Sequence, residues 1–156
     1  MKRETIFLRL AVIILGLPIV GFLAFLTYDL ITVPKKEGFS LFIQMVLVLY
    51  LSAIPYFFAL FQTMKLLGQI DRNEAFSNIS VTALKNIKRC AIIISGLFIV
   101  DLPFLYRIAE IDDAPGVLLF SLMIIFASIV IAVFAAVLQK LLTSALEMKS
   151  ENDLTI

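Results

Sequence analysis

The side chain with the clearest chemical potential in this sequence is an acid within an apolar run. Asp101 lies in the segment "GLFIVDLPFLYR" (96–107), where most of the other side chains are Leu, Ile, Phe and Val. A charged side chain at the centre of a membrane helix costs about 3 kcal/mol on insertion scales, so such an acid is protonated, paired or in contact with water. Asp101 is therefore a candidate for binding a proton or a cation. A structural hydrogen bond to a neighbouring helix is the interpretation that we favour.

Three polar residues are candidates to accompany Asp101. Tyr28 and Gln44 fall at a comparable depth in neighbouring apolar segments, and both can donate a hydrogen bond to a carboxylate. Arg107 follows six residues later, which places it about 120° around a helix, so it is a poor partner for Asp101. Glu110 is better placed to pair with Arg107. The predicted intramembrane polar site is thus Asp101, Gln44, Tyr28 and Arg107.

The inventory of residue types argues against an enzyme. The chain of 156 residues has no histidine and a single cysteine, Cys90. This removes the commonest general base and metal ligand and leaves no intrachain disulfide. The sequence has no nucleophile elbow, no phosphate-binding loop and no zinc-ligand spacing. We therefore expect no catalytic residue, no metal and no cofactor.

The composition places the chain in lipid. Hydrophobic residues make up 62% of it and charged residues 16%, and the mean hydropathy is +1.05, whereas soluble domains are about 45–50% apolar. A helix of about 20 apolar residues is long enough to cross the hydrocarbon core of a bilayer. Four such runs predict membrane spans in a single membrane domain, 1–156, at about 6–28, 40–62, 87–109 and 116–140.

The connections between the spans predict the topology. The segments "DLITVPKKEGFS" (29–40) and "EIDDAPG" (110–116) are short, and short loops make consecutive helices antiparallel neighbours. The predicted fold is an all-α, integral membrane four-helix bundle in up-down-up-down order. Small residues permit close helix packing in lipid. Those expected to face neighbouring helices are Ser52, Ala59, Ala91, Ser95, Ser128, Ala132 and Ala136.

Basic residues predict the orientation, because Lys and Arg concentrate on the cytoplasmic side of membrane spans. Ten of the 13 Lys and Arg residues lie at the expected cytoplasmic ends of the spans, in or next to the N-terminus, the middle loop and the tail: Lys2, Arg3, Arg9, Lys65, Arg72, Lys85, Lys88, Arg89, Lys140 and Lys149. The other three are Lys35, Lys36 and Arg107. Both termini are therefore expected in the cytoplasm. Arg9, near the inner end of the first span, is expected to snorkel toward the lipid headgroups.

The predicted cytoplasmic loop, 63–86, has a pattern of its own. Apolar residues recur after the second span and can extend its helix until Asp71–Arg72–Asn73 breaks it. Ser80 is expected to be the N-cap of the next helix, because serine is a favoured N-cap and apolar residues follow it at helical spacing. This second helix is expected to run directly into the third span.

Basic residues and the tail complete the expected cytoplasmic side. Lys85, Lys88 and Arg89 stand at the entry to the third span, and we interpret them as the basic collar that accompanies most inner loops. A surface for anionic lipid headgroups or for a protein partner is the alternative. The tail, 141–156, is expected to continue the fourth helix beyond the bilayer.

Two stretches on the expected cytoplasmic side resemble a known protein family. They are "NEAFSNISVTALKNIKRCAIIISGL" (73–97) and "ALEMKSENDLTI" (145–156). They are similar to a bacterial family of small four-span membrane proteins, domain-of-unknown-function family 2975. The resemblance covers nearly the whole chain and implies no catalytic residue, because the family has no assigned activity. Members often lie beside a gene for a Cro-type helix-turn-helix repressor, which implies a regulatory or stress-response setting.

These observations lead to two expectations about function. The first is a non-catalytic, multi-pass protein of the bacterial cytoplasmic (plasma) membrane that acts as an interaction or regulatory component through its cytoplasmic loop and tail. The second is a small transporter or immunity-type protein that handles a cationic or peptide substrate at Asp101. The lipid bilayer is the expected partner, and a cytoplasmic or membrane protein and a second copy of the chain are left open. No direct nucleic-acid partner is expected.

Overall fold

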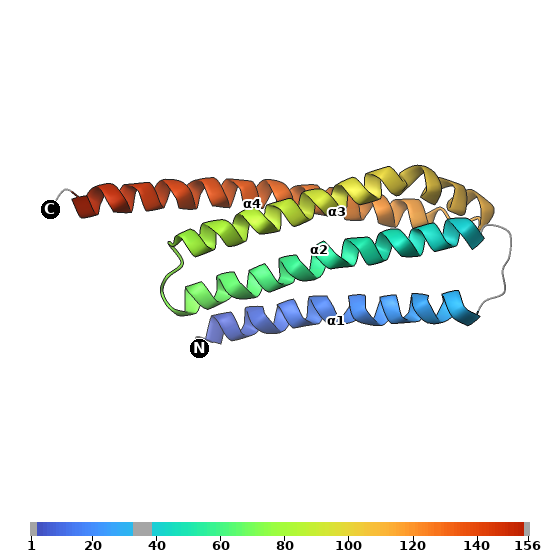
Figure 1. The fold of residues 1–156 in the computed structure, drawn as a ribbon, viewed down its shortest axis with the longest axis horizontal. Helices are drawn as coiled ribbons and strands as arrows, with labels where there is room; N and C mark the ends of the chain where they lie inside the picture. Colours follow the sequence, from blue (N-terminus) through green and yellow to red (C-terminus); the bar gives the residue numbers. More distant parts are fainter. Residues whose placement is uncertain (1–2, 33–38, 155–156) are drawn as a thin grey trace.

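Four long antiparallel helices make up the molecule. The computed structural model describes residues 3–32 and 39–154, and Figure 1 shows the helices side by side. They are α1 (Arg3–Thr32), α2 (Phe39–Asp71), α3 (Asn78–Ile111) and α4 (Gly116–Leu154). Each contains a stretch long and apolar enough to cross a membrane. The predicted all-α fold with four membrane helices is confirmed.

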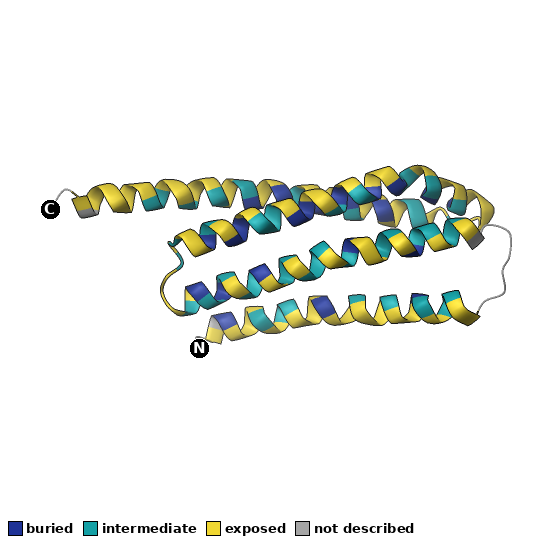
Figure 2. Cartoon of the chain, viewed as in Figure 1, coloured by how far each residue is buried: buried dark blue, intermediate teal, exposed yellow. Residues whose placement is uncertain are grey.

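The helices pack as a row in the order of the sequence. α3 lies between α2 and α4, whereas α1 packs on α2 alone among the described residues. In the most apolar window of α3, 28% of the residues are buried, against 6% in α1 (Figure 2). The main core is the cluster of Phe98, Leu105 and Ile125, against which side chains of α2 and α4 pack. α3 is therefore the structural centre, and α1 is an edge helix that is largely exposed to lipid.

Most of the small residues predicted to face neighbouring helices do so. Ser52, Ala91, Ser95, Ser128 and Ala132 are buried, and Ala59 and Ala136 are half-buried. On α4, Ala135 is more buried than the predicted Ala136. Small side chains let helix backbones approach each other, which is how helices gain packing energy when lipid removes the hydrophobic driving force.

The connection between α2 and α3 is shorter than the polar segment that contains it. α2 continues to Asp71, where the sequence predicts the break, and α3 begins at Asn78. Two residues with left-handed backbone follow the ends of α2 and α3: Asn73 (φ 58°) and Asp113 (φ 49°). After each of them, the next N–H donates to a carbonyl five residues earlier. This is the Schellman arrangement, which satisfies the last carbonyls of a helix.

The predicted N-cap of α3 is wrong by one turn. Ser77, not Ser80, is the N-cap: its backbone is extended (φ −144°, ψ 160°), and its Oγ accepts a hydrogen bond from the Ser80 N–H at 3.3 Å. Ser80 lies inside the first turn and is fully buried. Both serines fit the sequence pattern, but only Ser77 has the non-helical backbone that an N-cap requires.

The contact between α1 and α2 depends on a close approach at Gly16. Gly16 is buried, and a Cβ added there would lie 3.3 Å from Leu60 Cδ1 and 3.7 Å from Phe57 Cε1. Near this point the Tyr56 hydroxyl donates to the carbonyl oxygen of Leu15 at 2.7 Å. At Gly21, further along α1, an added Cβ would meet no described atom within 4 Å beyond its chain neighbours and its own helix backbone.

A bulky residue at position 16 is expected to loosen α1 from α2. Gly16→Ile should lower the stability of the detergent-solubilised protein by about 1–3 kcal/mol, because overpacking at a tight contact forces the helices apart. Gly21→Ile is the matched control, since it makes the same change in the same helix where there is room. Thermal unfolding followed by circular dichroism measures both variants, and equal midpoints for the two would contradict the assigned contact.

Candidate functional site

Asp101 occupies the buried side of α3. Its exposed fraction is 2%, and it lies between Phe98 and Leu105, which belong to the main core cluster. Within the part of the chain that the structure describes, its Oδ1 atom has no hydrogen-bond partner. A polar atom buried without a partner costs about 1–3 kcal/mol, so a feature of this kind calls for an explanation beyond packing.

None of the predicted partners forms a hydrogen bond with Asp101 Oδ1 in the described chain. Tyr28 is 65% exposed and lies on α1, which packs on α2 and not on α3 in the described chain. Arg107 is exposed on α3 itself, and Gln44 on α2 is half-buried. The order of the helices accounts for the position of Tyr28, and the rotation of Arg107 around α3 accounts for its exposure.

A polar network at the end of the bundle is the feature that sequence reasoning missed. Arg9 Nη2 donates to Asp71 Oδ2 at 2.8 Å, and the Thr5 hydroxyl donates to the other carboxylate oxygen of Asp71. Arg9 was expected to snorkel, but it forms an ion pair that joins the start of α1 to the end of α2. The signal in the sequence was the opposite charge at two positions that an antiparallel hairpin brings to the same end.

A second group of hydrogen bonds joins the end of α2 to the start of α3. The Ser77 hydroxyl donates to Gln69 Oε1 at 3.4 Å and lies 3.3 Å from the Ser80 hydroxyl. Gln69 and Ser80 are both buried. Three helix ends are thus held together by hydrogen bonds where the apolar packing stops, and this positions the surface around the 72–77 connection.

The predicted basic collar divides into two parts. Lys85 and Arg89 are exposed, whereas Lys88 Nζ donates to Gln139 Oε1 of α4 at 3.3 Å. Lys88 therefore has a structural contact that sets the register of α3 against α4. Lys85 and Arg89 are the two members available to lipid or to a partner.

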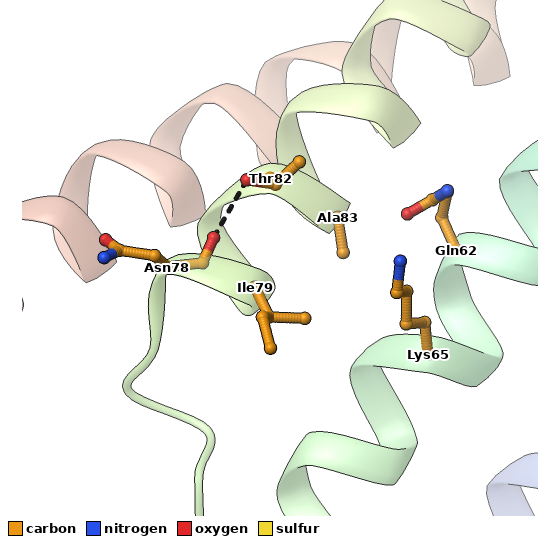
Figure 3. A pocket seen from close by; sticks show the side chains of 6 residues that line it. All are labelled: Gln62, Lys65, Asn78, Ile79, Thr82 and Ala83. Carbon is orange, nitrogen blue, oxygen red and sulfur yellow. Dashed lines mark hydrogen bonds between the residues drawn. The ribbon is translucent and has the colours of Figure 1, made fainter.

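A pocket of about 210 Å³ lies between the ends of α2 and α3 at this same end (Figure 3). The Thr82 hydroxyl donates to the carbonyl oxygen of Asn78 at 2.9 Å within its wall. Gln62 is 5% exposed, and Figure 3 shows its amide and the Lys65 ammonium on the same side of the pocket. The residues that line it are Gln62, Lys65, Asn78, Ile79, Thr82 and Ala83.

Comparison with known proteins covers the whole chain. An uncharacterized membrane protein of Bacillus subtilis (strain 168), YoaS, is 51% identical over 164 residues, which span 99% of each chain. No solved structure matches. A family described as a protein of unknown function, DUF2975, matches residues 4–156. Together with the four membrane helices, these matches show that the chain is a multi-pass membrane protein and belongs to the DUF2975 family.

Proposed function

We propose that this protein is a non-catalytic component of the bacterial cytoplasmic membrane that binds a regulatory or stress-response protein partner. The contact surface is the terminal face, defined as the 72–77 connection with the adjoining ends of α1, α2, α3 and α4. The supporting observation is the exposure of apolar side chains on this face outside the predicted spans: Phe76 is 60% exposed and Met148 is 69% exposed. Apolar groups rimmed by charges are typical of protein interaction sites.

The length of α4 adds to this support. The contact between Lys88 and Gln139 aligns the two helices, and beyond it α3 has residues 78–87 whereas α4 continues over 140–154. Figure 1 shows the end of α4 projecting past the start of α3. Leu154 at this projecting end is 84% exposed. A helix that extends without a neighbour offers one long side to a partner.

The proposal requires the terminal face to lie in the cytoplasm. Its support is the distribution of Lys and Arg, which favours the same end of the bundle. In a Cys90→Ser background, a membrane-impermeant maleimide added to intact cells should label a cysteine placed at Asp113 but not one placed at Ser150, since both positions are exposed and lie at opposite ends. After lysis both should react. Labelling of position 150 in intact cells would reverse the orientation.

Capture of a partner is expected at the terminal face and not at the other end. A photo-cross-linking amino acid at Phe76 should yield a discrete adduct in cells, and one at Ile111, which is 55% exposed at the far end, should not. Lys85→Glu combined with Arg89→Glu should reduce the adduct at least about fivefold, because charge at an interface rim steers association. Arg107→Glu is the matched control. An identical adduct pattern from both cross-linker positions would refute the proposal.

A second function is favoured by one observation: Asp101 is buried, and its Oδ1 atom has no hydrogen-bond partner within the described residues. A lone intramembrane acid commonly marks a proton or ion pathway, so a small transporter or immunity-type protein for a cationic or peptide substrate is the alternative. In that case Asp101 carries the coupled proton or contacts the cation directly.

Two substitutions at Asp101 separate these functions. Asp101→Leu should raise the unfolding free energy by about 1–3 kcal/mol, because it removes a buried polar group that has no hydrogen-bond partner. If the alternative function holds, Asp101→Asn should abolish protection of cells against a cationic peptide while membrane levels stay unchanged. Full protection by Asp101→Asn would eliminate the transporter. A large loss of stability in Asp101→Leu would show that the acid has a partner.

A further inference from the structure

The pocket between α2 and α3 contains a buried polar side chain that the fold does not use. Gln62 as a whole residue is only 5% exposed. Its amide forms no hydrogen bond within the described chain, and, unlike Asp101 Oδ1, its polar atoms keep some contact with solvent. It nevertheless lines the pocket, where Figure 3 shows it beside the space between the two helices. The amide therefore keeps a donor and an acceptor that a ligand in the pocket can use, since polar groups on largely buried side chains are usually hydrogen-bonded.

The electrostatics of the pocket favour an anion. Lys65 is the charged residue among the lining side chains, and no acidic residue lines the pocket. Asn78 and Ile79, the first two residues of α3, form another part of the wall. The Ser77 hydroxyl and carbonyl take up the N–H groups of Ser80 and Val81, whereas the described chain provides no acceptor for those of Asn78 and Ile79. The positive end of a long helix therefore lies at the pocket beside Lys65.

The depth of the pocket indicates where the anion comes from. Gln62 is the last residue of the predicted second span, 40–62, and Lys65 lies one helical turn beyond it. Ile79 and Ala83 supply an apolar wall on the opposite helix. A pocket at this level opens where lipid phosphates lie, and basic pockets between membrane helices are suited to anionic headgroups.

From these observations we infer that this pocket binds the phosphate group of an anionic phospholipid headgroup. The Lys65 ammonium supplies charge, the Gln62 amide donates a hydrogen bond to a phosphate oxygen, and the start of α3 adds its dipole. The inference needs only that the helices span a bilayer, so it stands or falls apart from the protein partner proposed above.

The test uses the full-length protein in nanodiscs of phosphatidylcholine with increasing phosphatidylglycerol, and thermal stability reports binding. The wild type should be stabilised progressively by phosphatidylglycerol. Lys65→Gln should weaken the apparent affinity roughly fivefold, which is the contribution of one cation near the membrane surface. Lys65→Arg should retain the wild-type apparent affinity for phosphatidylglycerol, because it keeps the positive charge. Lys140→Gln is the matched control, because Lys140 is an exposed lysine of α4 outside the pocket.

Gln62→Leu distinguishes a ligand-binding role from a structural one. In pure phosphatidylcholine this variant should be at least as stable as the wild type, because the substitution removes no hydrogen bond within the described chain and places an apolar side chain at a largely buried position. Its stabilisation by phosphatidylglycerol should nevertheless fall severalfold. Lower stability in phosphatidylcholine with an unchanged response to phosphatidylglycerol would assign Gln62 to the fold and overturn the inference.

Two further results would also overturn it. One is an equal response of the wild type to phosphatidylcholine and phosphatidylglycerol. The other is full stabilisation by inorganic phosphate added to phosphatidylcholine nanodiscs, which would assign the pocket to a soluble phosphate instead of a lipid headgroup. If inorganic phosphate has no effect on the stability of the protein in phosphatidylcholine nanodiscs, the result supports a lipid headgroup as the source of the bound phosphate.

Discussion

The exclusion of water from the hydrocarbon core is the constraint on which this structure depends. Backbone N–H and C=O groups inside lipid must bond to each other, and an α-helix satisfies them within one segment. This explains why the helices continue through Pro18, Pro55 and Pro103, although proline removes one backbone donor at each position. Near Pro18, the Tyr56 hydroxyl of α2 donates to the Leu15 carbonyl, which adjoins the Ile14 carbonyl that loses its usual N–H donor to the proline.

The exclusion of water also gives two acidic residues, Asp71 and Asp101, different roles. Asp71 lies at the end of α2, where Arg9 and Thr5 satisfy its carboxylate, and it joins two helices. Asp101 is more deeply buried and has an oxygen atom without a partner in the described chain. An acid that is fully paired is explained by the fold. A buried acid with an unpartnered oxygen has a desolvation cost that no contact in the described chain offsets. For this reason Asp101 is the basis of the alternative function.

The two proposals for the terminal face depend on different groups. A protein partner would contact exposed side chains such as Phe76 and Met148, whereas a lipid phosphate would enter between α2 and α3 at Gln62 and Lys65. The two sites are contiguous through the start of α3, because Ser77 caps the helix whose first residues line the pocket. Lipid bound there would stabilise the helix end from which the 72–77 connection begins. Membership of the DUF2975 family is compatible with either function, since the family description assigns none.

Much of the fold was predictable from local sequence. A run of apolar residues identifies a membrane helix by its length alone, and the break at Asp71 follows from three consecutive polar residues. The candidate site was not predictable in the same way. Gln44 and Tyr28 were placed near Asp101 by depth, but depth does not specify which helices are neighbours or how each is rotated.

By itself, then, the sequence determined that the chain lies in a lipid bilayer, how many helices it has, and that consecutive helices are antiparallel. Only the tertiary structure decided that α1 is an edge helix, that Arg9 pairs with Asp71, that one oxygen of Asp101 has no partner in the described part of the chain, and that Gln62 lines a pocket. The physical reason is that a helix apolar on every side has no polar stripe to mark its inner face. Its rotation and its neighbours are chosen by the packing of all the helices together.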